Sequence, residues 1–194
     1  HKFSSGSCTE GRICAKAALK FILENGDAPA VDMGKVEELK SFILKPMDTF
    51  ETHKGASTDP DINPNYLRPK MAMFRLQKIM DEYAGGVSTN FTTSKENLEK
   101  GLELLDFLKE DFEHLAAEDL HELLRCWENV HRTWQAEAHI RTILFREETR
   151  WPGYYFRSDN PSMDEDNWTV FVNSRWNPGT GEWEMTKKPI HRIF

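Results

Sequence analysis

Apolar residues recur at helical spacing along most of the chain. Between residues 13 and 25 they fall at steps of three and four, and Gly26 follows where helices commonly end. A shorter stretch of the same kind covers residues 31–43, and Pro46 is expected to stop it. Small polar residues and prolines from Asp48 to Asn65 then predict a long loop. The apolar stripe of the first helix has no parallel sheet in this chain to pack against, which indicates a missing partner domain.

Three longer amphipathic stretches follow, at residues 67–84, about 95–112 and about 117–149. The second starts at Thr93–Glu96, which fits a helix-capping box. The third is expected to end at Trp151–Pro152, because the residue before a proline disfavours helical geometry. Three such helices with short connections predict an antiparallel bundle. We expect the third helix to face the bundle with a heptad-like seam formed by Leu120, Leu124, Trp127, His131, Trp134, Ala138 and Phe145.

A hairpin signal follows the bundle. Trp168–Asn173 has the composition of a strand, Asn177–Gly181 that of a turn, and Glu182–Thr186 that of a second strand. A two-stranded hairpin is marginal alone, so it should dock on the bundle or on another chain. Its tryptophans could face a partner, since Trp is enriched in interfaces, or pack onto their own domain; both interpretations stay open for Trp168, Trp176 and Trp183. The predicted fold class is mainly α: an antiparallel helical bundle, preceded by a loop and helix and followed by a hairpin and irregular tail.

Composition narrows the class of protein. Hydrophobic content of 39% with 29% charged residues is typical of a globular chain. No apolar run approaches the roughly 20 residues that span a bilayer, and a net charge of −7 argues against a nucleic-acid binder. The three cysteines, Cys8, Cys14 and Cys126, have no disulfide or metal-site spacing, which favours a reduced, cytoplasmic setting. The histidines of the bundle stretches lack a second ligand at suitable spacing, so no metal is expected.

The first twelve residues carry the candidate chemistry. His1–Arg12 is interpreted as a small, hydroxyl-rich loop that opens the helix at Ile13. Free amides and the dipole at such a helix start can seat an anion or a polarised oxygen. Gly6 would allow close approach of the backbone, and Ser7 or Thr9 could cap. The alternative is an ordinary capped helix with His1 as an arbitrary first residue. The serines are not expected to be nucleophiles, because no nucleophile elbow or ordered triad accompanies them.

Two absences bear on any cofactor. The chain does not begin with methionine, which we interpret as the mark of a fragment or a processed piece. It also lacks a GxGxxG dinucleotide fingerprint. If a flavin is bound, most of its site should lie outside this sequence.

Two motifs resemble the flavoprotein subunit of the fumarate reductase and succinate dehydrogenase family. The first is the run His1–Arg12 with the helix after it. The second is Arg-x-Glu-x-Arg at residues 146–150 followed by Arg-x-Asp-x-Pro at residues 157–161, which resembles the signature after the last helix of the family's C-terminal bundle. Residues 76–80 resemble the start of that bundle. The resemblance therefore covers essentially the whole chain.

The resemblance implies FAD as cofactor, bound mostly by residues missing from this chain. Residues 1–26 would end the FAD-binding domain, 27–66 would form a connecting helix and long loop, 67–150 the helical bundle, and 151–194 the hairpin and tail. His1 is implied as a catalytic, cationic or proton-donating group. The helix start would stabilise the negative charge of reduced flavin near N1 and O2. The implied cofactor-binding residues are Ser4, Ser5, Gly6, Ser7, Cys8 and Thr9.

Departures from the family pattern indicate the substrate. Fumarate and succinate enzymes carry a carboxylate-binding arginine in the first loop, where this chain has Ser4–Ser5, so a dicarboxylate is not expected. With the Trp-Pro-Gly-Tyr-Tyr run at 151–155 and the tail at 181–185, this favours the branch that reduces adenosine 5′-phosphosulfate to AMP and sulfite, or runs the reverse, through a sulfite adduct at FAD N5. An iron–sulfur beta subunit would carry the electrons, and the fragment alone would be inactive. The alternatives are a fumarate reductase- or succinate dehydrogenase-like flavoprotein and a non-enzymatic helical interaction module.

Overall fold

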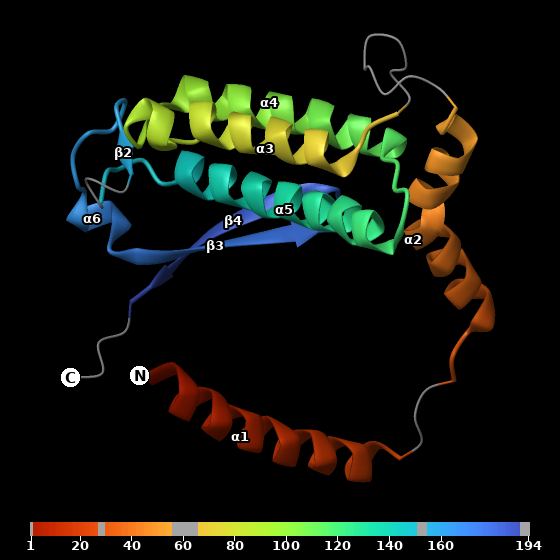
Figure 1. The fold of residues 1–194 in the computed structure, drawn as a ribbon. Coiled ribbons are helices and arrows are strands. Elements are labelled where there is room, and N and C mark those ends of the chain that lie inside the picture. Colours follow the sequence, from red (N-terminus) through yellow and green to blue (C-terminus); the bar gives the residue numbers. More distant parts are fainter. Residues whose placement is uncertain (1, 27–29, 56–65, 151–154, 191–194) are drawn as a thin grey trace. The chain divides into compact units, whose positions relative to one another are not determined.

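The computed structural model describes residues 2–26, 30–55, 66–150 and 155–190 (Figure 1). The chain divides into two compact units, His1–Phe42 and Ile43–Phe194, which are taken one at a time. Among the described residues, no helix is long and apolar enough to cross a membrane. The larger unit contains the bundle and the hairpin.

Three helices form the bundle: α3 (Pro69–Tyr83), α4 (Lys95–Asp111) and α5 (Leu120–Phe145). They lie side by side in Figure 1, each antiparallel to the next along the chain, and each contacts the other two. Their shared core consists of Leu76, Ile79, Ala84, Leu98, Leu105, Leu108, Ala136, Ile140 and Ile143. The expected bundle and fold class are confirmed.

The helix ends follow local sequence signals. Pro69 lies in the first turn of α3, where its missing N–H costs nothing, and Gly85 follows the helix at φ +81°, a left-handed conformation that favours glycine. Ser94 accepts a hydrogen bond from the Asn97 amide at the start of α4, and Asp119 accepts one from the Glu122 amide at the start of α5. In place of the capping box expected at Thr93–Glu96, α4 therefore has an N-cap formed by the Ser94 side chain.

The predicted seam of α5 is wrong. Leu120, Leu124 and Trp134 are all more than half exposed. The face of α5 that meets the bundle carries Leu123, Cys126, Asn129, Thr133, Ala136, Glu137, Ile140 and Ile143. Three of these residues are polar, and each is bonded: Asn129 Nδ2 donates to the Pro69 carbonyl at 2.7 Å, Thr133 Oγ1 to the Asn129 carbonyl, and Glu137 accepts from cations. Satisfied polar groups can occupy a core, and the hydrophobic pattern could not reveal them.

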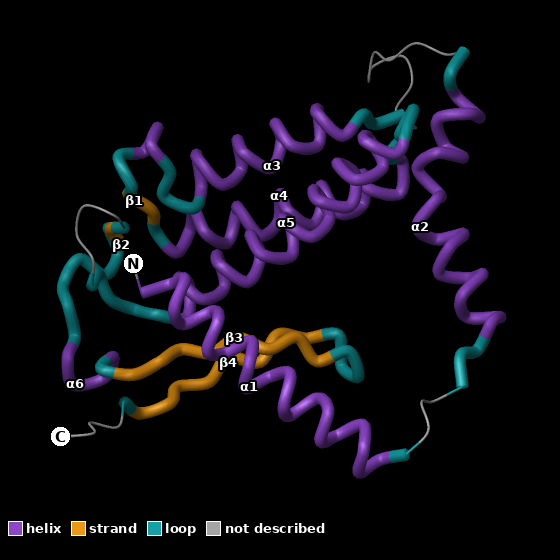
Figure 2. Tube along the Cα trace, turned by 60° about the horizontal axis from the view of Figure 1, so that its bottom comes forward, coloured by secondary structure: helices purple, strands orange, loops and turns teal. Residues whose placement is uncertain are grey.

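Helix α5 ends at Phe145 instead of Trp151, with Arg146 extended. Beyond it, β1 (Thr92–Thr93) and β2 (Phe156–Arg157) pair in parallel at one end of the bundle, and Figure 2 shows the long hairpin lying apart from them. After the short helix α6 (Glu165–Trp168), the hairpin consists of β3 (Val170–Asn177) and β4 (Glu182–Pro189). The predicted hairpin is confirmed, with a longer first strand that begins after Trp168.

The tryptophans of this region divide between the two interpretations. Trp168 is buried, with Phe145 edge-on to its ring at 5.7 Å and Lys187 Nζ 3.4 Å from the ring centroid, so it packs its own domain. Trp176 is half exposed and lies opposite Trp183 in the hairpin register. Those two residues remain available to a partner.

Helix α2 (Met33–His53) continues through Pro46, so the predicted stop at Pro46 and the loop from Asp48 are wrong over Pro46–His53. Pro46 cannot donate a helical N–H, but contacts within the larger unit hold this segment. Trp127 Nε1 donates to the Ile43 carbonyl at 3.0 Å, and the Ala117 amide donates to the Pro46 carbonyl at 2.8 Å. These tertiary contacts thus outweigh the free-energy cost of a proline inside the helix.

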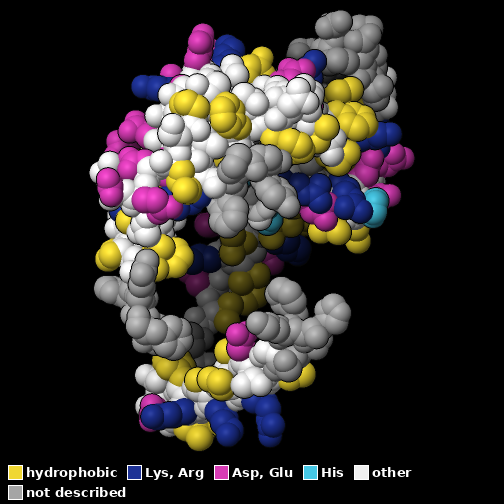
Figure 3. Space-filling model, turned by 90° about the vertical axis from the view of Figure 1, so that its left-hand side faces the viewer, with side chains coloured by type: hydrophobic (Ala, Val, Ile, Leu, Met, Phe, Trp, Pro, Cys, Tyr) yellow, Lys and Arg dark blue, Asp and Glu magenta, His cyan; other side chains and the backbone are white. Residues whose placement is uncertain are grey.

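Helix α1 (Lys2–Asn25) occupies the first unit. The expected loop over His1–Arg12 is wrong from Lys2 onward, because the described residues there are helical. No proline interrupts them, and extending a helix already formed at Ile13–Asn25 costs little per residue. Hydrophobic side chains (yellow) reach the surface of the molecule among charged ones (Figure 3). On α1 the large hydrophobic residues that are exposed are Ile13, Leu19, Phe21, Ile22 and Leu23.

Two adjacent leucines test the corrected face of α5. Leu123 is 7% exposed and packs in the core, whereas Leu124 is 56% exposed. Leu123→Ala should lower the free energy of unfolding by about 2–4 kcal/mol through lost burial and a cavity, and Leu124→Ala by less than about 1 kcal/mol. Urea unfolding followed by circular dichroism measures both. A larger effect at Leu124 would restore the seam predicted from the sequence.

Candidate functional site

The predicted N-terminal site falls partly outside the described residues. His1 is not among them, and the side chains of Ser4 and Ser5 are not described either. Gly6 is partly buried, and an added Cβ there would meet nothing within 4 Å. Ser7, Cys8 and Thr9 are exposed along α1. Their predicted role in cofactor binding stays a prediction.

The start of α1 at Lys2 changes which amides could serve a ligand. Only the first four N–H groups of a helix lack an acceptor within it, which in the described part of α1 means those of Lys2, Phe3 and Ser4. The amides of Ser5–Thr9 belong to the helical ladder, so these residues could reach a ligand only through side chains or close approach. The first turn carries no acidic residue, so nothing there opposes the dipole's attraction for negative charge. The helix start therefore fits an electron-rich group.

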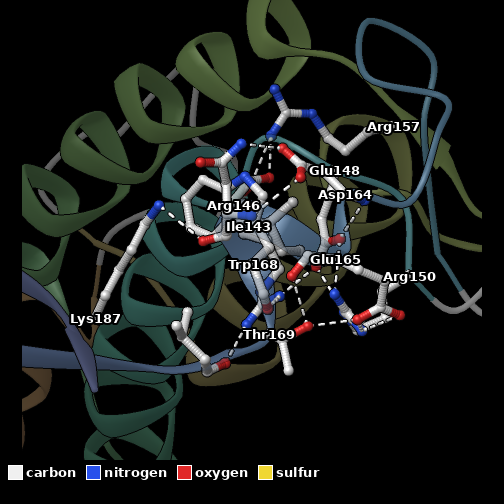
Figure 4. Close-up of polar contacts among 12 residues, drawn as sticks. Ile143, Arg146, Glu148, Arg150, Arg157, Asp164, Glu165, Trp168, Thr169 and Lys187 are labelled. Carbon is white, nitrogen blue, oxygen red and sulfur yellow. Dashed lines mark hydrogen bonds and ion pairs between the residues drawn. The ribbon is translucent and has the colours of Figure 1, made fainter. Parts of the chain in front are cut away.

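The second motif forms a buried ionic cluster (Figure 4). The Glu148 side chain is completely buried between two arginines. Its Oε1 accepts hydrogen bonds from Arg146 Nη1 and, at 2.7 Å, from Arg150 Nε. Its Oε2 accepts from Arg150 Nη2 and from the Asp164 amide, both at 3.0 Å. One carboxylate therefore ties the end of α5 to the segment that leads into α6.

The electrostatics of Glu148 reflect two opposing causes. Burial disfavours the ionised carboxylate, but hydrogen bonds from Arg150, Asp164 N and Arg146 outweigh it, so the pKa of Glu148 is lower than usual. The glutamate stays charged at neutral pH and has no tendency to accept a proton. This argues for a positioning role instead of acid–base chemistry.

Arg157 closes the C-terminal end of α5. Its side chain is 1% exposed, and Nη1 donates to the carbonyls of Ile143 at 2.6 Å and Arg146 at 3.2 Å. Its Nε donates to Asp159 Oδ1 at 2.7 Å. The last carbonyls of a helix have no amide partners within it, so this guanidinium satisfies groups that burial would otherwise leave costly.

Thr149 links both sides of residues 151–154, which lie outside the described residues. Its Oγ1 accepts from the Arg157 amide at 2.9 Å and donates to the Asn160 carbonyl at 2.7 Å. Its amide donates to the Ser162 carbonyl at 3.1 Å. The cluster around Glu148, Thr149 and Arg157 thus brings together the described segments that precede residue 151 and follow residue 154. The motif spacing signalled the cluster, but its geometry was not predicted.

The described histidines and acidic residues do not form a metal centre. In the part of the chain that the structure describes, no three side chains of His, Cys, Asp or Glu are grouped to hold an ion. Burial lowers the pKa of His139, which favours its neutral form. All three cysteines are free thiols, and burial raises the pKa of Cys126 to about 12.

Most of the bundle, the buried Arg-Glu-Arg cluster and the hairpin lie within a region that matches the C-terminal part of a class of flavoproteins. The family described as fumarate reductase flavoprotein C-term matches residues 73–193. The chain belongs to this family, which confirms the resemblance seen in the sequence.

Within the family, the chain is similar to adenylylsulfate reductases. It is 48% identical over its whole length to adenylylsulfate reductase subunit alpha of Megalodesulfovibrio gigas and covers 29% of that protein. The structure of adenylylsulfate reductase from the hyperthermophile Archaeoglobus fulgidus matches all of the chain at 54% identity with a TM-score of 0.90. A structure of adenosine-5-phosphosulfate reductase in complex with sulfite, as a covalent adduct, matches equally well. The chain spans about 30% of the length of these relatives.

More distant structures share only the fold. The flavoprotein FrdA of Escherichia coli quinol fumarate reductase matches 93% of the chain with a TM-score of 0.67 at 15% identity. The likeness supports the architecture of the bundle and hairpin and says nothing of the substrate.

The buried cluster has a testable energetic signature. Glu148→Gln should lower the free energy of unfolding at pH 7 by roughly 3 kcal/mol, because both arginines lose a buried partner. Glu165→Gln removes a mostly exposed carboxylate that also pairs with Arg150 and should cost less than about 1 kcal/mol. Urea unfolding of both variants measures the difference. Similar effects would show that burial of Glu148 is not what stabilises the cluster.

The same variant predicts a pH dependence. The pKa of Glu148 is lowered in the folded state, so its stabilisation is complete above its unfolded pKa of about 4.3 and is lost as pH falls through the folded value. The stability of the parental protein should therefore fall more steeply below about pH 4.5 than that of Glu148→Gln. Parallel acid limbs in thermal melts of the two proteins would contradict this.

Proposed function

We propose that the chain is the C-terminal part of an FAD-dependent oxidoreductase that interconverts adenosine 5′-phosphosulfate with AMP and sulfite. The observation that carries the proposal is the identity of 48–54% to adenylylsulfate reductases over the whole chain. The relative with a covalent sulfite adduct supports the sulfur chemistry. The distant fumarate reductase structure supports the fold alone and gives no support to a dicarboxylate substrate.

The residues that serve the flavin in this proposal lie at the start of α1. Bound FAD would exchange two electrons with the sulfur of the substrate. The amide of Ser4 is among those that lack a helical acceptor, and it would face the electron-rich edge of the ring with Ser5 beside it. Gly6 would allow close approach because nothing fills the space beside it. The side chains of Ser7, Cys8 and Thr9 would complete the contact.

His1 is the proposed catalytic residue. An imidazole near its ordinary pKa can hold a proton beside the sulfonyl or phosphate oxygens at neutral pH. A positioned proton or positive charge stabilises the charge that develops as the sulfur–oxygen bond breaks. The residue directly precedes the helix start, so both groups would act on the same end of the substrate.

The proposed partner is an iron–sulfur beta subunit that exchanges electrons with the flavin. The relative's designation as subunit alpha supports an assembly of several chains. The proposed setting is the cytoplasm, supported by three cysteines that remain free thiols.

The activity is tested on the full-length protein that contains this chain. We expect a yellow protein with a flavin spectrum that reduces ferricyanide when AMP and sulfite are both present, because oxidation of sulfite with AMP releases two electrons. Fumarate-dependent oxidation of a reduced viologen would favour a fumarate reductase-like enzyme instead. A colourless protein without either activity would leave the non-enzymatic interaction module.

The role of His1 is tested by substitution in the same protein. His1→Ala should lower turnover about 10²-fold or more, the scale of general acid–base catalysis, and leave flavin content nearly unchanged. Val36→Ala, a change at a partly exposed position of α2, is the matched control and should leave both quantities unchanged. Equal turnover in His1→Ala and the parental protein would remove the proposed role.

A further inference from the structure

A cavity of about 450 Å³ lies between the bundle and the hairpin, away from the cluster around Glu148. Its lining residues are Lys109 of α4, Trp134 and Glu137 of α5, and Trp176 and Trp183 of the hairpin. A neighbouring cavity shares Lys109, Glu137, Trp176 and Trp183 and extends the cleft along the hairpin turn. Volumes of this size are typical of ligand sites. We call the two together the tryptophan cleft.

The walls of the tryptophan cleft are three indoles. Trp176 and Trp183 face each other across the hairpin, with ring centroids 5.7 Å apart and an interplanar angle of 62°. Trp134 projects from α5 and is 58% exposed. Exposed indoles grouped around one cavity are costly to leave in water and are typical of recognition surfaces.

The two cations of the cleft are already paired with carboxylates. Glu137 is buried and accepts from Lys109 Nζ at 2.7 Å and from Arg141 Nε at 2.9 Å. Lys109 Nζ also donates to Asp106 at 2.8 Å. The lining has three carboxylates, Asp106, Glu137 and Glu182, against the two cations Lys109 and Arg141. A phosphate or another anion would find paired cations and a net negative wall, so the chemistry favours an occupant without negative charge.

One hydrogen-bond donor in the cleft is unsatisfied among the described residues. Trp183 Nε1 is buried and has no hydrogen-bond partner within the described part of the chain. Unsatisfied buried donors are rare because they lose their hydrogen bonds to water. Because Trp183 Nε1 is closed off from solvent, a ligand can reach it only if the Trp183 indole reorients. Backbone carbonyls of an extended polypeptide are acceptors of the required kind, since polyproline II geometry leaves them without internal partners.

We propose that the tryptophan cleft binds an extended, uncharged polypeptide segment rich in proline, whose rings pack on Trp134 and Trp176 and whose carbonyl accepts from Trp183 Nε1. Aromatic grooves recognise such segments because the segment is already ordered before binding and presents flat apolar rings. The proposal rests on the cleft alone and does not depend on the proposed oxidoreductase activity.

The test uses the full-length protein and the blocked peptide Ac-(Pro)6-NH2, followed by calorimetry and tryptophan fluorescence. We expect saturable binding with a change in indole emission. Ac-(Gly-Ser)3-NH2, of equal length but without rings, should not bind. Trp183→Phe keeps an aromatic ring but removes the donor and should weaken binding about fivefold or more, the scale of one lost hydrogen bond. Trp134→Ala should weaken it about tenfold or more.

Phe171→Ala provides the matched control, because Phe171 is an exposed aromatic residue on the same hairpin but outside the cleft lining. Its affinity should stay within about twofold of the parental value, and thermal melts of all variants should confirm that they are folded. Absence of saturable binding to the parental protein would overturn the proposal. So would equal affinities of Trp183→Phe, Trp134→Ala and Phe171→Ala, or equal binding of both peptides.

Discussion

The architecture of the larger unit depends on one buried carboxylate. Glu148 would be very costly to bury alone, and it is tolerated because Arg146, Arg150 and the Asp164 amide all donate to it. This requirement explains why the chain leaves α5 at Arg146, because the non-helical backbone of residues 146–150 lets both arginines meet the glutamate between them. Arg157 then supplies the partners that the helix end lacks. The path of the chain from α5 to α6 is a consequence of these bonds.

Much of the larger unit could be predicted from the sequence. The predicted stretches 67–84 and about 95–112 agree with α3 and α4 to within two residues, because the ends of these helices follow local signals at Pro69, Gly85 and Ser94. The hairpin followed from alternation and turn residues. The family could be predicted from motif spacing. These features depend on residues that are close in sequence, where propensity and capping act directly.

Two of the errors have a common physical cause, which is long-range contact. Pro46 is typical of a helix stop, yet bonds to Trp127 and Ala117 hold the helix beyond it. Leu124 has the spacing of a core residue and is exposed, because the buried face of α5 includes Asn129, Thr133 and Glu137, whose partners the pattern cannot show. At the N-terminus, the residues expected to form a loop are helical. The free amides of the candidate site therefore lie in the first turn of α1 and not at Ile13.

The separations between bonded residues around Glu148 imply an order of assembly. Arg146 donates to the Val170 carbonyl, which is 24 residues further along the chain. The Asp164 amide and Glu148 are 16 residues apart, and Arg157 and the Ile143 carbonyl are 14 residues apart. Short closures of this kind cost little chain entropy and can form rapidly. By contrast, Asp159 accepts from the Lys95 amide, 64 residues away, and Ser158 donates to the Thr93 carbonyl, 65 residues away. The bonds around Glu148 can therefore form before the contacts with Lys95 and Thr93 that hold this segment against the start of α4.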